Sequence, residues 1–98
     1  MGITDGNKKV MDRQVYAADQ VIFREGKPGS AAFVVQEGRV EIFKTMNGNE
    51  EVILGTIEAG GLFGELALVD NQPRMASARA RERTVLIAIN RQMFEQKM

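Results

Sequence analysis

The residues with the clearest chemical potential in this sequence lie in one glycine-rich segment that begins at Gly60. The segment reads G-G-L-F-G-E-L-A-L-V-D-N-Q-P-R-M-A-S-A. Its glycines permit sharp turns and let a ligand approach the backbone without a Cβ in the way. A short helix that begins near Glu65 would offer unpaired N–H groups to a phosphate. Arg74, braced by Pro73, would add a planar fork of donors for two phosphate oxygens, so the segment could hold one anion from two sides.

Glu65 adds a carboxylate to this anion site, where it would repel a phosphate unless it had a partner of its own. A sugar hydroxyl would be such a partner, because an ionised carboxylate is a strong acceptor while the helix N-terminus and Arg74 offset its charge. The whole segment therefore favours a ligand that carries a phosphate and a hydroxyl together. The alternative is a structural ion pair between Glu65 and Arg74, the usual role of a Glu and an Arg that share a loop.

The composition excludes most catalytic chemistry. The 98 residues include no Cys and no His, which removes thiol nucleophiles, imidazole bases and the usual nitrogen and sulfur ligands of zinc, copper and iron. Lys and Arg number 13, as do Asp and Glu, so a net charge of zero gives no general attraction to nucleic acid or to an acidic membrane. Apolar runs such as residues 85–89 are far too short to span a bilayer. We therefore expect one cytoplasmic domain that is not an enzyme, holds no metal or cofactor, and by itself binds neither nucleic acid nor membrane.

The elements that must position this segment are predicted to be strands. Short stretches rich in Val, Ile and Phe alternate with turn residues, which is typical of antiparallel strands closed into a sandwich or barrel. Strands are predicted over residues 14–16, 20–23, 31–36, 39–44, 51–57, 77–80 and 84–89. Asn47 and Gly48 both tolerate positive φ, so they predict a hairpin turn between two of these strands.

Helices are predicted to be few and short. They are expected over residues 65–69, over residues 8–13, and from Arg91, with Asn90 as its N-cap, to the end of the chain. Residues 1–13 should then form an N-terminal segment that is partly disordered or carries the short helix. Residues 14–98 should form the domain.

The glycine-rich segment resembles the phosphate-binding cassette of the cyclic-nucleotide-binding domain family. That family includes the regulatory subunits of cyclic-AMP-dependent kinase, the bacterial catabolite activator and cyclic-nucleotide-gated channels. Its cassette has the pattern F-G-E-[LM]-A followed, after a gap, by P-R-[AST]-A-[ST]. The two matching stretches are Phe63-Gly64-Glu65-Leu66-Ala67 and Pro73-Arg74-Met75-Ala76-Ser77. Glycine-punctuated turns upstream extend the resemblance to residues 16–94.

The resemblance implies a mainly β fold, an antiparallel β-roll (a double-stranded β-helix or jelly roll) with a short cassette helix and terminal helices. In the family two helices follow the barrel and the second closes over the base. This chain ends inside the first of them, so its C-terminal lid helix would be truncated. The implied ligand is a 3′,5′-cyclic purine nucleotide, cyclic AMP, with cyclic GMP as the alternative. The implied role is a regulatory sensor whose partner is an output domain absent from this sequence.

The resemblance also assigns contacts to the phosphate and the ribose, residue by residue. Arg74 would bind the cyclic phosphate, and backbone N–H groups of Ala67 and Met75 would complete the phosphate cradle. Glu65 would accept a hydrogen bond from the ribose 2′-hydroxyl. Together these residues would supply the phosphate and hydroxyl contacts that the segment favours.

The same resemblance places Gly64 and Leu66 on the ribose side, and Ile42 would pack on the base. Two departures from the family pattern concern Ser30, where Asp is usual, and Met75, which replaces Ala, Ser or Thr. Ser30 changes a turn and should leave the site alone. Met75 lacks the hydroxyl with which Thr can bind the guanine amino group, so cyclic AMP should be preferred.

Two other functions compete with this hypothesis. A β-roll without a nucleotide could serve as a protein-interaction domain, although the intact Glu65 and Arg74 argue against it. The absence of His argues strongly against an enzyme of the cupin type, because such metal sites usually need two or more His.

The remaining arginines and the phenylalanines of the strands are expected to have structural roles. Three arginines are interpreted as the solvated face of a strand and turn: Arg79, Arg81 and Arg83. Three phenylalanines are interpreted as core or near-core strand residues: Phe23, Phe33 and Phe43.

Overall fold

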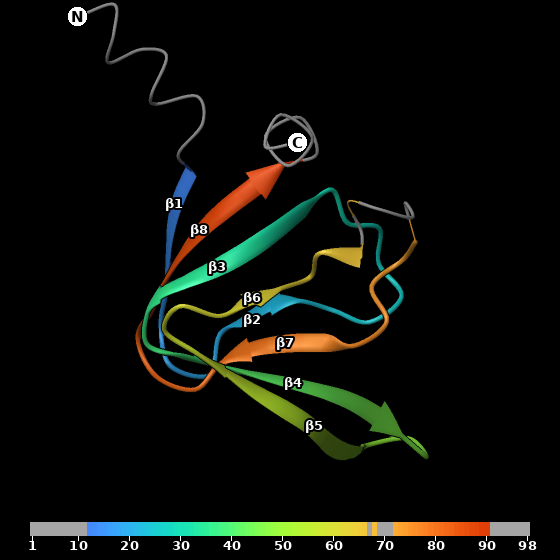
Figure 1. The fold of residues 1–98 in the computed structure, drawn as a ribbon. Coiled ribbons are helices and arrows are strands. Elements are labelled where there is room, and N and C mark those ends of the chain that lie inside the picture. Colours follow the sequence, from blue (N-terminus) through green and yellow to red (C-terminus); the bar gives the residue numbers. More distant parts are fainter. Residues whose placement is uncertain (1–11, 67, 69–71, 91–98) are drawn as a thin grey trace, which may run out of the picture.

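The computed structural model describes residues 12–66, 68 and 72–90, and the strands of this part form two antiparallel sheets (Figure 1). The strands are β1 (Asp12–Tyr16), β2 (Val21–Phe23), β3 (Ala31–Glu37), β4 (Arg39–Met46), β5 (Glu50–Glu58), β6 (Leu62–Phe63), β7 (Ser77–Ala80) and β8 (Thr84–Asn90). One sheet has the order β1-β8-β3-β6, and the other has the order β2-β7-β4-β5. Strands from distant parts of the chain therefore lie side by side in both sheets.

The predicted mainly β fold is confirmed, and each of the seven predicted strands is present with ends shifted by a few residues at most. The strand β6, which lies inside the glycine-rich segment, was not predicted. It is only two residues long, so it is too short to show the alternation by which strands are recognised. It is held by pairing with β3, where Phe33 lies opposite Phe63 and Val34 lies opposite Leu62.

The helix predicted over residues 8–13 is wrong at its C-terminal end. Asp12 and Arg13 lie in β1, where they pair with Ala88 and Ile87 of β8. The neighbouring strand supplies backbone partners, and this tertiary pairing overrides the local preference. The β-roll therefore includes two residues that were assigned to the N-terminal segment. Residues 8–11 and the helix predicted from Arg91 lie outside the described residues.

The cassette helix predicted over residues 65–69 is described only in part. Leu66 and Leu68 have helical conformation, and the N–H of Leu68 donates to the carbonyl of Glu65 at 3.0 Å. Ala67 and Val69 lie outside the described residues. The described part agrees with a short turn of helix directly after β6.

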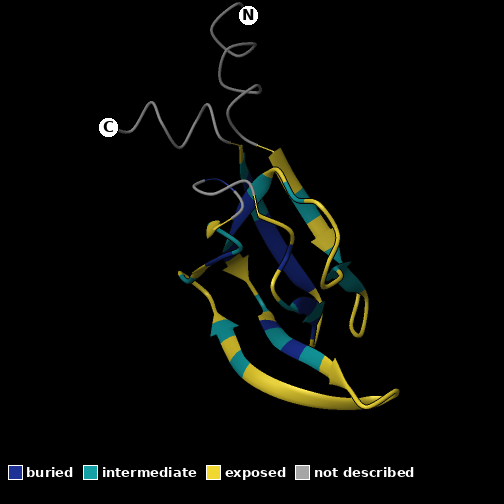
Figure 2. Cartoon of the chain, turned by 90° about the vertical axis from the view of Figure 1, so that its right-hand side faces the viewer, coloured by how far each residue is buried: buried dark blue, intermediate teal, exposed yellow. Residues whose placement is uncertain are grey.

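The core lies between the two sheets. One buried cluster includes Phe33 and Val35 of β3 and Leu86 of β8 from the first sheet, together with Val40 of β4 and Ala78 of β7 from the second. Figure 2 shows buried residues on the inner strands and exposed residues along most of β5. Each large apolar side chain buried in this way contributes roughly 1.5–3 kcal/mol to folding. This shared core holds the two sheets together. It thereby also fixes the end of the cassette, because Ser77 is the first residue of β7.

The strands β4 and β5 form the predicted hairpin. Asn47 has φ 43° and Gly48 has φ 91°, so both use the left-handed region that favours this pair of residues at a turn. The strand β5 lies at the edge of its sheet, and Figure 2 shows most of it exposed. The strand β5 therefore gains little from apolar burial, and backbone pairing connects it to β4 but not to β7.

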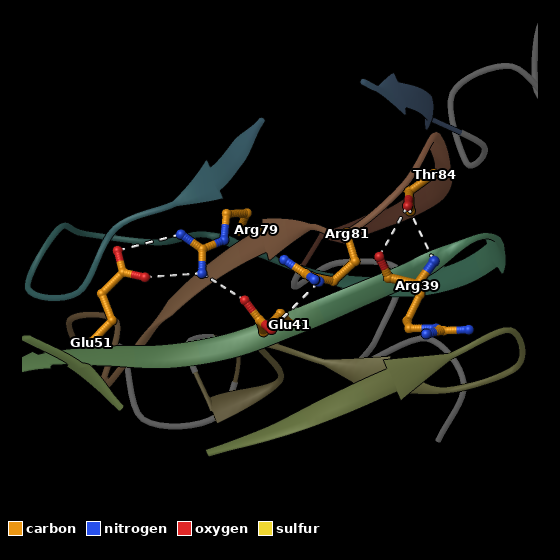
Figure 3. Close-up of polar contacts among 6 residues, drawn as sticks. All are labelled: Arg39, Glu41, Glu51, Arg79, Arg81 and Thr84. Carbon is orange, nitrogen blue, oxygen red and sulfur yellow. Dashed lines mark hydrogen bonds and ion pairs between the residues drawn. The ribbon is translucent and has the colours of Figure 1, made fainter. Parts of the chain in front are cut away.

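A polar network on the outer face connects β5 to β7 across β4 (Figure 3). Arg79 of β7 donates to Glu41 of β4 at 2.6 Å and to Glu51 of β5 at 3.0 Å, and Arg81 lies 3.5 Å from Glu41. The guanidinium of Arg79 also lies 4.3 Å from the ring centroid of Phe43. Hydrogen bonds from Arg79 to Glu51 and Glu41 raise the pKa of the arginine. The interpretation of Arg79 as a solvated residue is wrong, because its side chain is only 19% exposed.

Candidate functional site

A pocket of about 190 Å³ lies beside the cassette. Five of the residues predicted for the ligand site line it together: Ile42, Gly64, Leu66, Arg74 and Met75. They come from β4, from the turn after β6 and from the loop before β7, so the fold gathers them from three parts of the chain. The wall is mostly apolar, and Arg74 is the one charged residue among its described lining residues. The pocket is thus suited to an apolar group attached to an anion.

Arg74 is the electrostatic centre of this pocket. Arg74 as a whole is only 8% exposed, although its side chain is a cation. One terminal nitrogen, Nη1, donates to the carbonyl of Gly64 at 3.0 Å, and the other, Nη2, donates to the carbonyl of Ala31 at 2.8 Å. Burial lowers the pKa of Arg74, because a buried cation loses hydration that these neutral carbonyls replace only in part.

No carboxylate neutralises Arg74 among the residues that the structure describes. The ion pairs in this part of the chain involve other arginines and one lysine: Lys44–Glu25, Arg79–Glu41, Arg79–Glu51, Arg81–Glu41 and Arg83–Glu37. The Nε of Arg74 is buried and has no acceptor there either. A buried donor without an acceptor costs about 1–3 kcal/mol. An anion in the pocket would supply both the missing charge and an acceptor.

The loop between β2 and β3 holds the backbone of Arg74. The N–H of Arg74 donates to the carbonyl of Lys27 at 2.9 Å, and the N–H of Gly26 donates to the carbonyl of Arg74 at 2.8 Å. A third bond, from the N–H of Glu25 to the Oγ of Ser77 at 2.9 Å, ties the same loop to the start of β7. The arginine is therefore placed by residues almost fifty positions earlier in the chain.

Gly64 has a conformation and a position that both require glycine. Its φ is +79°, in the left-handed region. A Cβ at this residue would lie 2.9 Å from Nη1 of Arg74 and 3.5 Å from the ring of Phe23. The glycine thus lets the backbone carbonyl reach the guanidinium.

Two of the predicted site residues, Glu65 and Ala67, are not among the described residues that line the pocket. Glu65 is half-buried and lies next to Gly64, but it does not line the pocket. It makes no ion pair with Arg74, although the structure describes both residues, so the structural ion-pair alternative does not hold in this conformation. Ala67 lies outside the described residues. The contacts assigned to these two residues stay predictions.

Three lining residues were not among those predicted for the site: Phe23, Pro73 and Ala76. Pro73 and Ala76 belong to the cassette pattern, so their place in it was the available signal. Phe23 was interpreted as a core or near-core residue, and it does pack against the core cluster. Nothing in its type or spacing indicated that the same ring also reaches the pocket.

Neither a metal centre nor a membrane-spanning helix is present in the described part of the chain. No group of three or more His, Cys, Asp or Glu side chains there is arranged to hold a metal ion. No helix among these residues is long and apolar enough to cross a membrane.

The chain is similar in sequence to known proteins. Over 91 residues it is 40% identical to the cAMP-dependent protein kinase regulatory subunit of Blastocladiella emersonii, a match that covers 93% of this chain and 22% of that protein. Over 82 residues it is 40% identical to the Cyclic AMP receptor protein of Thermus thermophilus, covering 84% and 38% respectively. The chain thus spans well under half the length of these curated relatives.

Solved structures agree with the sequence relatives. The EAL enzyme Bd1971 matches in a cAMP-bound form and in a cGMP-bound form, each with a TM-score of 0.82 and 38% identity over 88% of this chain and 23% of that one. The family described as "Cyclic nucleotide-binding domain" matches residues 13–98. Because this match covers both sheets and the pocket around Arg74, the chain belongs to the cyclic-nucleotide-binding domain family.

Proposed function

We propose that this chain binds a 3′,5′-cyclic purine nucleotide, cyclic AMP, in the pocket beside the cassette and acts as a regulatory sensor. The observation that carries the proposal is Arg74, a buried cation without a carboxylate partner in the described residues. Such a group attracts an anion, and a guanidinium presents donors that match phosphate oxygens. Relatives named for cyclic AMP support the same ligand.

The other lining residues suit the rest of a nucleotide. Ile42, Leu66 and Met75 offer apolar surface on which a purine can pack. Glu65 would accept a hydrogen bond from the ribose 2′-hydroxyl, and backbone N–H groups of Ala67 and Met75 would complete the phosphate contacts. Gly64 would let the ribose approach the backbone. In this arrangement the ligand needs no metal and undergoes no reaction.

The pocket is too small and too open to enclose a whole nucleotide. Its volume of about 190 Å³ is below the roughly 300–1,000 Å³ of most small-molecule sites. Met75 and Leu66 at its wall are also largely exposed, so a bound base would remain partly open to water. A following helix could bury the base and transmit binding to an output domain, because a ligand shifts an equilibrium only through contacts that differ between two states. We place such a sensor in the cytoplasm.

The test is calorimetric titration of the chain with four compounds: cyclic AMP, cyclic GMP, 5′-AMP and adenosine. We expect cyclic AMP to bind most tightly and adenosine, which lacks the phosphate, to bind most weakly. Binding of 5′-AMP should be weaker than that of cyclic AMP, because its doubly charged phosphate is not closed onto the ribose. Failure of every compound to bind would overturn the proposal and favour the nucleotide-free interaction domain. Tighter binding of cyclic GMP would overturn the choice of base alone.

A further inference from the structure

Arg74 lies against an aromatic ring that the core holds in place. Its Cζ is 4.1 Å from the centroid of the Phe23 ring. Phe23 in turn packs with Phe33 and Phe63, at centroid distances of 6.1 Å and 5.9 Å. A guanidinium is attracted to the face of an aromatic ring, and the attraction is strongest where water is excluded. The ring therefore fixes the guanidinium without neutralising its charge.

Gly29 makes a second close approach to the same side chain. A Cβ at this glycine would lie 2.3 Å from Nε of Arg74, 2.4 Å from Cζ and 2.7 Å from Nη2. These distances are shorter than non-bonded atoms allow, so any other residue here would displace the guanidinium or the loop. Gly29 does not have a positive φ, so its backbone conformation does not require glycine. The space that Arg74 occupies is what requires it.

These contacts have a common property, which is that all of them are neutral. The carbonyls of Gly64 and Ala31, the ring of Phe23 and the bare backbone of Gly29 orient the guanidinium. A carboxylate would hold the arginine more strongly but would also compete with an incoming anion. Neutral contacts leave the positive charge available.

We propose that Phe23 and Gly29 are positioning residues, which hold Arg74 in its phosphate-binding orientation before the ligand arrives. The inference rests on the proposed function for the ligand that Arg74 receives. The inference that Phe23 and Gly29 position Arg74 concerns the chain without ligand. The two parts can therefore be tested apart.

The first experiment needs no ligand. In a proton–nitrogen correlation spectrum, the Arg74 Nε–H signal, assigned by its disappearance in Arg74→Ala, should be shifted by the ring current of Phe23 and exchange slowly with water. Phe23→Leu and Gly29→Ala should each remove the shift and speed the exchange. Two matched controls should preserve the signal: Phe43→Leu, which removes the ring beneath Arg79 instead, and Gly55→Ala, where a Cβ would meet nothing within 4 Å. An unchanged signal in Phe23→Leu and Gly29→Ala would overturn the proposal, provided that thermal unfolding shows both variants folded.

The second experiment is a double-mutant cycle with cyclic AMP. Phe23→Leu should weaken binding by about 3- to 30-fold, the range expected when a cation–π interaction is removed from a partly dry site, and Gly29→Ala by about tenfold or more. In the Arg74→Ala background neither change should weaken binding by more than about twofold, because each acts through the arginine. Equal weakening in both backgrounds would show that Phe23 or Gly29 touches the nucleotide itself, and would overturn the positioning role. If the parent chain bound no nucleotide while the Nε–H signal responded as expected, the proposed function would fail and the positioning role would stand.

Discussion

Arg79 and Glu41 lie directly opposite each other on β7 and β4, and the guanidinium donates to the carboxylate at 2.6 Å. The pair lies on the outer face of the sheet, where β7 begins three residues after Arg74. Glu51 of β5 accepts from the same guanidinium at 3.0 Å, which ties the edge strand to β7. The side chain of Arg79 thus connects the strand that follows the cassette to the edge strand β5, which does not pair with it.

Arg79→Ala should therefore destabilise the fold. The change removes both ion pairs and uncovers the Phe43 ring. It also leaves Glu41, whose side chain is only 12% exposed, with Arg81 as its one ion-pair partner among the described residues. We expect the free energy of unfolding to fall by about 1–3 kcal/mol. Urea denaturation measures it. Arg83→Ala is the control, because Arg83 pairs with Glu37 at 3.6 Å with both side chains more than 60% exposed, and its removal should cost less than about 0.5 kcal/mol. Equal stability of Arg79→Ala and the parent would show that the network does not anchor the hairpin.

Arg74→Ala should weaken cyclic AMP binding by about 1.5–3 kcal/mol, the range for losing a hydrogen bond to a charged group. The fold should remain intact, because Arg74 is not a member of the core cluster and lies outside the pairing of β4 with β7. Calorimetry gives the affinity, and circular dichroism checks the fold. Arg81→Ala removes a cation of the outer face, whose side chain is 49% exposed, and should leave binding unchanged. Unchanged affinity of Arg74→Ala would remove this residue from the site.

Glu65→Gln should mainly reduce discrimination at the ribose. The amide keeps the shape of the carboxylate but is a weaker acceptor for a hydroxyl. The parent should prefer cyclic AMP over 2′-deoxy cyclic AMP in a competition titration, and the variant should prefer it less. Glu58→Gln, an exposed change at the end of β5, serves as control and should keep the preference of the parent. If Glu65→Gln discriminated as strongly as the parent, Glu65 would have some other role.

Met75→Thr should improve the binding of cyclic GMP. Met75 lines the pocket and is 62% exposed, and its thioether offers no donor or strong acceptor to the guanine amino group. A threonine hydroxyl could bind that group when the base is turned over the phosphate, with a net gain of about 0.5–1.5 kcal/mol. Titration of both nucleotides against parent and variant measures the change. An unmoved ratio of the two affinities would show that selectivity is set elsewhere.

Most of the described strands and the cassette could be predicted from the residues alone, because both depend on local patterns. Alternation of apolar and polar residues is a property of neighbours, so it indicated the strand from Arg39 without any tertiary contact. The pair Asn47 and Gly48 likewise specified a hairpin through the backbone angles that they allow. The spacing of Glu65 and Arg74 within one glycine-rich segment indicated an anion site for the same reason.

The surroundings of Arg74 could not be predicted from local patterns, because they come from distant parts of the chain. Phe23 and Gly29 lie more than forty residues before Arg74 in the sequence. By residue type alone, Phe23 could have been an ordinary core residue and Gly29 an ordinary turn residue. The same holds for Arg79. Its sequence context suggested a solvated side chain, but pairing of β7 with β4 places it against Glu41 and leaves it only 19% exposed. Whether a polar side chain is buried depends on which strands pair and in what register, and pairing is decided by the packing of the whole chain.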